Sequence, residues 1–220
     1  MAELITELDP SVVRANLEHT RDEITGASPN GGQVEILAAV KYIPSEELGA
    51  LAEAGLTLLG ENRAQDLVAK ADAHPGRFLW DFIGHLQSRK VKQILPHVRL
   101  IHSVATDSVL EQLRRHAAPE TEVLVEINIA REEGKSGIDP DELGPFLERC
   151  PVRVVGLMTM PPLAMDPEQS RPHFAALREL AARHSLSQLS MGTSQDYLVA
   201  AQEGATIVRL GTTLYAHPSS

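Results

Sequence analysis

Short apolar runs alternate with longer amphipathic segments along most of this 220-residue chain. The runs are Glu35–Lys41, Leu56–Gly60, Phe78–Gly84, Arg99–Ser103, Glu122–Ile129, Arg153–Met158, Leu186–Met191 and Thr206–Gly211. Parallel strands buried on both faces read as continuous apolar runs, and helices usually connect them. Eight such units predict an α/β protein built as a single (β/α)8 TIM barrel, with a doubly wound open sheet as the alternative. No G-x-G-x-x-G follows the first run, which disfavours a dinucleotide-binding open sheet.

The segments between the runs have helical length and spacing. An additional N-terminal helix is expected over Asp9–Gly26, ended by Gly26 and the turn 29–32. Ser45 and Asp107 are expected as N-caps, and Gly55 and Gly204 as C-caps. The other predicted helices are Ser45–Ala54, Asn62–Ala73, Gln87–Leu95, Asp107–His116, Asp139–Cys150, Pro167–His184 and Gln195–Glu203.

The length predicts one domain over residues 1–220, with a helix and loop at 1–32 and the barrel at 33–216. Twenty Lys and Arg against 30 Asp and Glu give a net charge of −10, which argues against binding nucleic acid or an anionic membrane. No apolar run approaches a membrane span, and the acidic N-terminus does not resemble a secretion signal. The single Cys150 excludes an internal disulfide. A cytoplasmic protein is expected.

Lys41 stands at the end of the first apolar run, at the edge where a barrel carries its functional groups. A lysine in that position is expected to be partly desolvated, which favours the neutral amine that attacks carbonyl carbon and forms a Schiff base. The alternative is a lysine whose stem packs at the strand end while its charge reaches solvent.

The last two runs lead into turns rich in glycine and hydroxyl groups. These turns supply the backbone amides and hydroxyls of Gly192, Thr193, Ser194, Gly211 and Thr212. The loops after strands 7 and 8 of a barrel often bind phosphate, although either turn alone would be an ordinary strand–helix connection. A phosphate site beside a reactive lysine suggests an aldehyde that carries a phosphate, as pyridoxal 5'-phosphate (PLP) does.

Further polar residues follow the strand ends. Arg209 would reach a bound ring if its side chain points inward, whereas Arg153 is expected at the surface. Asn62 can donate a hydrogen bond to a ring oxygen, and His85 could stack on the ring or only cap a helix.

Met158 and Met160 are expected to serve packing, and the loop 161–169 could border the site. No H-E-x-x-H pairing supports a zinc site.

Several motifs together resemble the YggS/PROSC family of PLP-binding proteins, also called PLP homeostasis proteins. They are ILAAVKYIP, LLGENRAQDL, WDFIGHLQSRKVK, EINIAREEGKSGI, GLMTMPP, LSMGTSQD and ATIVRLGTTLYA, and they cover nearly the whole chain after Val34. The order of FIGHLQ, KSGI, S-M-G-x-S-x-D and V-R-x-G is specific to this family.

The resemblance implies a barrel like the N-terminal domain of alanine racemase, with the cofactor held as a Schiff base on Lys41. It implies phosphate binding by Ser194, Gly211 and Thr212, and places Arg209 at the pyridine nitrogen. Asn62 and His85 match positions that line the family's pocket. This chain departs from the common AVSK, SMGMS and terminal Phe-Gly, yet the lysine, serine and arginine of these motifs remain.

An arginine at the pyridine nitrogen has no acceptor and keeps that nitrogen unprotonated, which makes the ring a weaker electron sink. The barrel also uses the chain up to Gly211, leaving little for the second domain that racemases have. We therefore expect a non-catalytic protein. The resemblance implies that it buffers PLP and supplies it through transient contact with enzymes that use it. A monomer is expected, because the family-like single domain needs no partner to complete its pocket. A PLP-dependent amino-acid racemase, or a Schiff-base aldolase without cofactor, are the alternatives.

Overall fold

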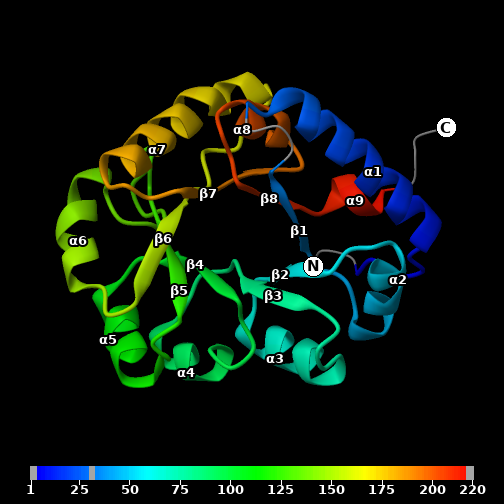
Figure 1. The fold of residues 1–220 in the computed structure, drawn as a ribbon, viewed down its shortest axis with the longest axis horizontal. Coiled ribbons are helices and arrows are strands. Elements are labelled where there is room, and N and C mark those ends of the chain that lie inside the picture. The colour runs from blue at the N-terminus through cyan, green and yellow to red at the C-terminus, as the bar shows by residue number, and fades with distance from the viewer. Residues whose placement is uncertain (1–3, 30–32, 217–220) are drawn as a thin grey trace.

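The structure is a computed structural model that describes residues 4–29 and 33–216. Within these residues, eight parallel strands form a closed barrel in which each strand pairs with the next and the last pairs with the first. Helices lie around the outside of the barrel (Figure 1). The predicted (β/α)8 barrel is confirmed, and the open-sheet alternative is wrong.

Each strand overlaps one of the predicted apolar runs. The strands are β1 (Glu35–Ala39), β2 (Leu58–Glu61), β3 (Leu79–Phe82), β4 (Leu100–Val104), β5 (Glu122–Glu126), β6 (Arg153–Met158), β7 (Gln188–Thr193) and β8 (Ile207–Leu210). Closure pairs Leu37 of β1 with Arg209 of β8. The end of β1, which leads to Lys41, therefore lies next to the end of β8, which leads to Gly211.

Helix α5 has the predicted bounds and α1 is shifted by one residue, whereas the other predicted helices have shorter regular parts. They are α1 (Pro10–Ala27), α2 (Leu48–Glu53), α3 (Ala64–Ala73), α4 (Val91–Ile94), α5 (Asp107–His116), α6 (Leu143–Arg149), α7 (Arg171–Arg183), α8 (Tyr197–Gln202) and α9 (Thr212–Tyr215). A 3-10 turn precedes α2, α4, α6 and α7. The four-residue α9 was not predicted, because so short a segment has no periodicity to detect.

Two predicted N-caps are wrong by one residue. Thr106, not Asp107, caps α5 and accepts a hydrogen bond from the Val109 amide at 3.3 Å. Pro44, not Ser45, precedes the 3-10 turn before α2. Both predicted C-cap glycines are in place just beyond their helices, at a φ of 90° that L-residues rarely adopt.

Helix α1 packs across the outside of the barrel, against α2, α8 and α9 (Figure 1). It buries Val13, Leu17 and Ile24 and ends at Ala27, one residue beyond the predicted Gly26. The predicted turn after it includes residues 30–32, which lie outside the described residues. The Tyr197 hydroxyl of α8 donates to Glu23 at 2.6 Å and ties the two helices together.

Buried apolar side chains form two clusters. The larger cluster joins the outer faces of the strands to the surrounding helices. The smaller cluster contains strand residues only, which places it inside the barrel: Leu37, Leu58, Leu100, Leu124, Val155, Met158 and Ile207. The interior is therefore a packed core, and the open space lies at the carboxyl ends of the strands.

Gly156 of β6 allows close contact with β7. A Cβ atom on Gly156 would lie 2.0 Å from the Gln188 carbonyl oxygen, far inside van der Waals contact. Gly49 in α2 has no atom near such a Cβ, so the two glycines form a matched pair for testing barrel packing.

Replacing Gly156 by Ala should lower the free energy of unfolding by about 1–3 kcal/mol, because the strands must separate to admit the methyl group. Gly49→Ala should raise it by roughly 0.4–1 kcal/mol, because alanine restricts the unfolded chain. Urea denaturation followed by circular dichroism measures both. Equal effects of the two substitutions would contradict the proposed packing role of Gly156.

Candidate functional site

A cavity of about 420 Å³ opens at the carboxyl ends of the strands. Its volume is within the range of small-molecule sites. All seven predicted site residues line it: Lys41, Asn62, His85, Ser194, Arg209, Gly211 and Thr212. The barrel thus gathers at one mouth residues that are spread over most of the sequence.

Lys41 follows β1 and contributes a primary amine to the cavity. Its side chain is exposed, and its Nζ lies 4.7 Å from the centre of the Tyr42 ring. The expected partial desolvation of Lys41 is therefore wrong, because the strand ends at Ala39 and the lysine stands beyond it in a turn. Among the described residues no carboxylate forms an ion pair with Lys41, so the amine is open to a ligand.

A buried ion pair beneath Lys41 fixes the loop that carries it. Lys70 of α3 donates to Glu61 Oε2 at 2.6 Å and to the Val40 carbonyl at 2.7 Å. Glu61 also accepts the amide of Asn62 at 2.7 Å. The ion pair therefore holds Val40, the residue before Lys41, and the backbone of Asn62. Lys41 and Asn62 are both predicted site residues. The sequence analysis did not predict this ion pair, although Lys70 and Glu61 are only nine positions apart in the chain.

The turns after β7 and β8 meet at the Ser194 hydroxyl. The Ser194 oxygen accepts the Gly211 amide at 3.2 Å and the Thr213 amide at 3.4 Å. The hydroxyl hydrogen of Ser194 stays available to donate, and Thr212 adds an exposed hydroxyl at the start of α9. The two predicted turns do form one polar wall of the cavity.

Two residues of the predicted turns do other work. Gly192 is buried, does not line the cavity and has a φ of 89°. A Cβ atom on it would lie 2.6 Å from the Ala200 Cβ of α8, so the glycine allows that close packing. Thr193 lines the cavity, but its amide and hydroxyl both donate to Asp196, at 2.7 and 3.1 Å. The expectation that both residues offer hydrogen bonds to phosphate is therefore wrong.

Arg209 points into the barrel and is only 6% exposed. Its guanidinium donates to the Ser190 hydroxyl, to the Thr159 carbonyl at 2.9 Å and to the Met160 sulfur at 2.8 Å. Burial lowers the pKa of Arg209 to about 10, against the opposing charges of Asp196 and Glu126, which leaves the group positive at neutral pH. The inward orientation is confirmed, whereas Arg153 is exposed and pairs with Glu122.

Asn62 and His85 occupy the β2 and β3 side of the cavity. The Asn62 side-chain oxygen is buried without a hydrogen-bond partner among the described residues. Gly84 lies against the Asn62 backbone, and a Cβ there would be 2.0 Å from the Asn62 carbonyl oxygen. His85 is exposed at the rim and also lines a neighbouring cavity with Arg63 and Arg89.

Other lining residues were not predicted. Glu126 of β5 is buried and accepts a hydrogen bond from Ser136, the serine of the KSGI motif. Tyr215 of α9 lines the cavity and donates to the Ala39 carbonyl at 3.4 Å. Met160 was expected only to pack, yet its sulfur contacts Arg209. Glu126 is the first residue of the EINIAREEGKSGI motif, so the motif contained the signal although no role was assigned to this glutamate.

The described part of the chain holds no cluster of three or more His, Cys, Asp or Glu side chains placed to bind a metal ion. None of the helices within residues 4–29 and 33–216 combines the length and apolar character that a membrane span requires.

Comparison with known proteins identifies relatives along nearly the entire chain. Residues 9–218 match the family described as alanine racemase, N-terminal domain. The pyridoxal phosphate homeostasis protein of Aquifex aeolicus is 38% identical over 217 residues, covering 90% of this chain and 95% of the relative. The protein of the same name from Vibrio cholerae is 32% identical, covering 92% and 95%.

Solved structures agree with the sequence relatives. PipY of Synechococcus elongatus, in a structure with PLP bound, is 29% identical with a TM-score of 0.79, covering 93% of this chain and 100% of PipY. Its fold is the closed barrel described above. Identity and coverage at this level show that the chain belongs to the pyridoxal phosphate homeostasis protein family, within the wider family of alanine racemase N-terminal domains.

Proposed function

We propose that this protein binds PLP as a Schiff base on Lys41 and acts in cytoplasmic PLP homeostasis, buffering and supplying the cofactor without catalytic turnover. The observation that carries the proposal is one cavity lined by an open amine, the Ser194 and Thr212 hydroxyls, and a buried guanidinium. These groups match the aldehyde, the phosphate and the pyridine nitrogen of PLP. The related PipY has been described with PLP bound.

The residues present fit the cofactor on each side of the cavity. PLP supplies an aldehyde, which condenses with a primary amine and releases water. The Ser194 hydroxyl and the exposed Thr212 can donate to a phosphate. The Asn62 oxygen, buried without a partner, leaves that side-chain amide free to engage a ring substituent.

Lys41 suits the Schiff base better than the other lysine near the site. Lys70 is buried and its Nζ is held by Glu61 and the Val40 carbonyl. An ammonium engaged in this way cannot leave its carboxylate without a large cost, since a buried charge would lose its partner. Lys41 has no such partner among the described residues and stands in the cavity wall.

Two observations favour a carrier over a catalyst. Arg209, placed at the pyridine nitrogen, would leave that nitrogen unprotonated and so weaken the ring as an electron sink. The two relatives reported above, each matched over 95% of its length, are named homeostasis proteins.

One chain supplies the described lining of the cavity, so the proposal needs only a monomer. Delivery would involve transient contact with enzymes that use PLP.

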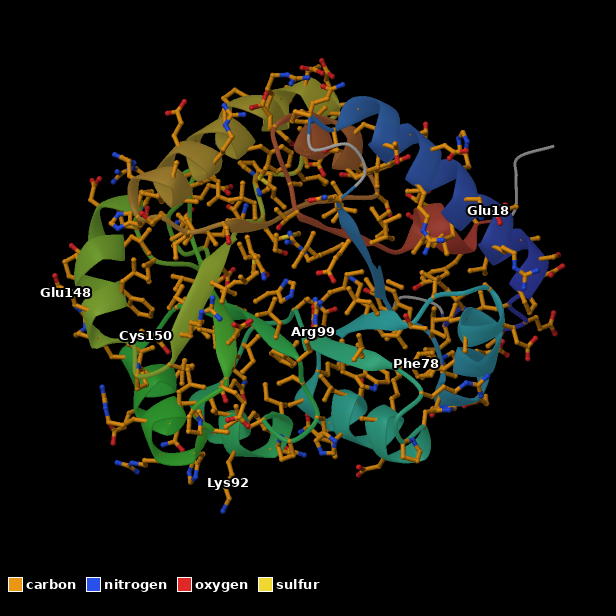
Figure 2. The ribbon with its side chains drawn as sticks, in the orientation of Figure 1. Glu18, Phe78, Lys92, Arg99, Glu148 and Cys150 are labelled. Carbon is orange, nitrogen blue, oxygen red and sulfur yellow. The ribbon has the colours of Figure 1, made fainter. Side chains whose placement is uncertain are left out.

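Lys41→Ala should abolish the absorbance band of the Schiff base when PLP is added, because no other open amine lines the described cavity wall. The matched control is Lys92→Ala in α4, whose side chain points away from the barrel (Figure 2). Absorbance spectroscopy of the two purified variants measures the difference. An unchanged band in Lys41→Ala would contradict the assignment.

Ser194→Ala should weaken PLP binding about tenfold or more, because it removes a hydrogen bond to a charged phosphate. Binding of pyridoxal, which lacks the phosphate, should change little. Ser187→Ala, at an exposed position immediately before β7, should leave both affinities unchanged. Fluorescence titration measures the four affinities. Equal losses for PLP and pyridoxal in Ser194→Ala would exclude a phosphate contact at Ser194.

The PLP-loaded protein should not racemise amino acids at ordinary enzyme rates. Incubation with single-enantiomer amino acids, followed by chiral chromatography, gives the turnover number. Turnover of about one per second or faster would establish the racemase alternative instead.

A further inference from the structure

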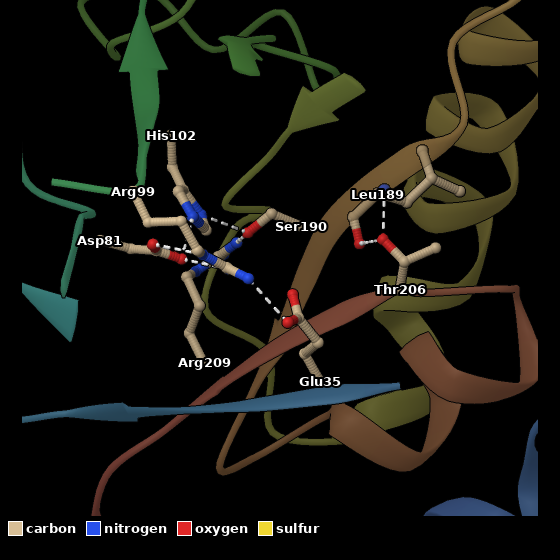
Figure 3. Close-up of polar contacts among 8 residues, drawn as sticks. All are labelled: Glu35, Asp81, Arg99, His102, Leu189, Ser190, Thr206 and Arg209. Atoms are coloured by element: carbon tan, nitrogen blue, oxygen red, sulfur yellow. Dashed lines mark hydrogen bonds and ion pairs between the residues drawn. The ribbon is translucent and has the colours of Figure 1, made fainter. Parts of the chain in front are cut away.

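A chain of hydrogen bonds runs through the inside of the barrel from Arg209. Ser190 of β7 contacts both Arg209 and His102 of β4, the latter at 2.8 Å (Figure 3). His102 contacts Asp81 of β3 at 3.0 Å, and Arg99 binds both oxygens of Asp81, at 3.0 and 2.7 Å. Strands β4 and β7 are not neighbours in the barrel, so the His102–Ser190 contact crosses its interior.

The chain continues to the opposite end of the barrel. Arg99 precedes β4 and donates to Glu35, the first residue of β1, at 2.7 Å. Asp81, His102 and Ser190 are completely buried, whereas Glu35 is exposed. The cavity floor is thus connected to the far rim through a polar column within an otherwise apolar interior.

Chemistry fixes the direction of each hydrogen bond. A guanidinium can only donate, so Ser190 Oγ accepts from Arg209 and the Ser190 hydrogen is free to donate to His102 Nδ1. The carboxylate of Asp81 can only accept, so His102 Nε2 must carry hydrogen. One neutral tautomer of His102 therefore satisfies both of its neighbours.

Electrostatics support this assignment. Burial lowers the pKa of His102, and the charges of Arg209 and Arg99 act in the same direction against the attraction of Asp81. Burial alone would raise the pKa of Asp81, but hydrogen bonds from His102 and Arg99 outweigh it and keep the carboxyl ionised. A neutral histidine thus lies between a carboxylate and a serine.

Arg209 depends on this chain for its orientation. Among residues 4–29 and 33–216, its guanidinium contacts no carboxylate directly. Its hydrogen-bond acceptors there are the Thr159 carbonyl, the Met160 sulfur and the Ser190 hydroxyl. The Met160 side chain is 45% exposed at the cavity mouth. Ser190 is therefore the fully buried side-chain contact that determines where Arg209 points.

We propose that Ser190, His102 and Asp81 are positioning residues that aim the Arg209 guanidinium into the cavity and so set the affinity for a ring-nitrogen acceptor. The inference deepens the proposed function and rests on it for the identity of the ring. It assigns roles to three interior residues that do not line the cavity.

The test compares PLP with its 1-deaza analogue, in which C–H replaces the ring nitrogen. Ser190→Ala should raise the Kd for PLP about tenfold, as expected for a misplaced charged hydrogen bond, and change that for the analogue less than about twofold. Ser103→Ala is the matched control: Ser103 is also buried in a barrel strand, but its hydroxyl has no partner among the described residues. It should leave both affinities unchanged.

His102 provides a rescue pair. In His102→Gln the amide can accept from Ser190 and donate to Asp81, so the ratio of the two affinities should stay near the native value. His102→Leu breaks both contacts and should reduce the ratio as Ser190→Ala does. A glutamine variant that loses the preference for PLP as fully as the leucine variant would overturn the relay.

A measurement on the native protein needs neither ligand nor a folded variant. ¹⁵N NMR of the imidazole should show His102 with hydrogen on Nε2 and no titration between about pH 5.5 and 8.5. A titration midpoint within this interval, or hydrogen on Nδ1, would overturn the proposed direction of the chain.

The outcomes separate this inference from the proposed function. A native protein with no Lys41-dependent band contradicts the function itself. A native protein with that band, together with equal losses of PLP and deaza-PLP affinity in Ser190→Ala, contradicts only the positioning role.

Discussion

Closure of the barrel by the hydrogen-bonded ladder between β1 and β8 is the constraint on which the site depends. Leu37 pairs with Arg209 and Ala38 with Leu210, so the two ends of the barrel sequence finish side by side. Lys41 then shares one cavity with Gly211, 170 positions later in the chain. An open sheet of the same strands would leave the amine and the hydroxyl–amide turns at opposite edges.

The interior of this barrel combines an apolar layer with a charged column. Burying Asp81 and Arg209 costs several kcal/mol for each ion before compensation, whereas Arg99 is exposed at the far rim. Full hydrogen bonding offsets this cost, since Asp81 accepts from both Arg99 and His102. An arrangement of this kind adds less to stability than to specificity, because each member has few orientations that satisfy its neighbours.

The sequence predicted those features that depend on local pattern. Apolar runs located all eight strands, and strand ends located Lys41, Ser194 and Arg209 at one mouth. The N-cap of α5 was missed by one residue because Thr106 and Asp107 are adjacent polar candidates for that position. The turn before α2 begins after Pro44, which makes no side-chain cap that a pattern of polar residues could reveal. Gly192 looked like a ligand-binding glycine but serves the approach of α8.

The remaining features depend on contacts between distant strands, which no local pattern encodes. His102 lies in a predicted strand and carries no motif that assigns it a partner; only the inward direction of its side chain brings it to Ser190, 88 positions away. Lys41 and Arg209 also differ in the exposure of their side chains, which the sequence does not show. The lysine is exposed and unpaired among described residues, whereas the arginine is buried and fixed. An exposed amine and a buried, fixed guanidinium in one cavity would suit the proposed reversible binding of PLP.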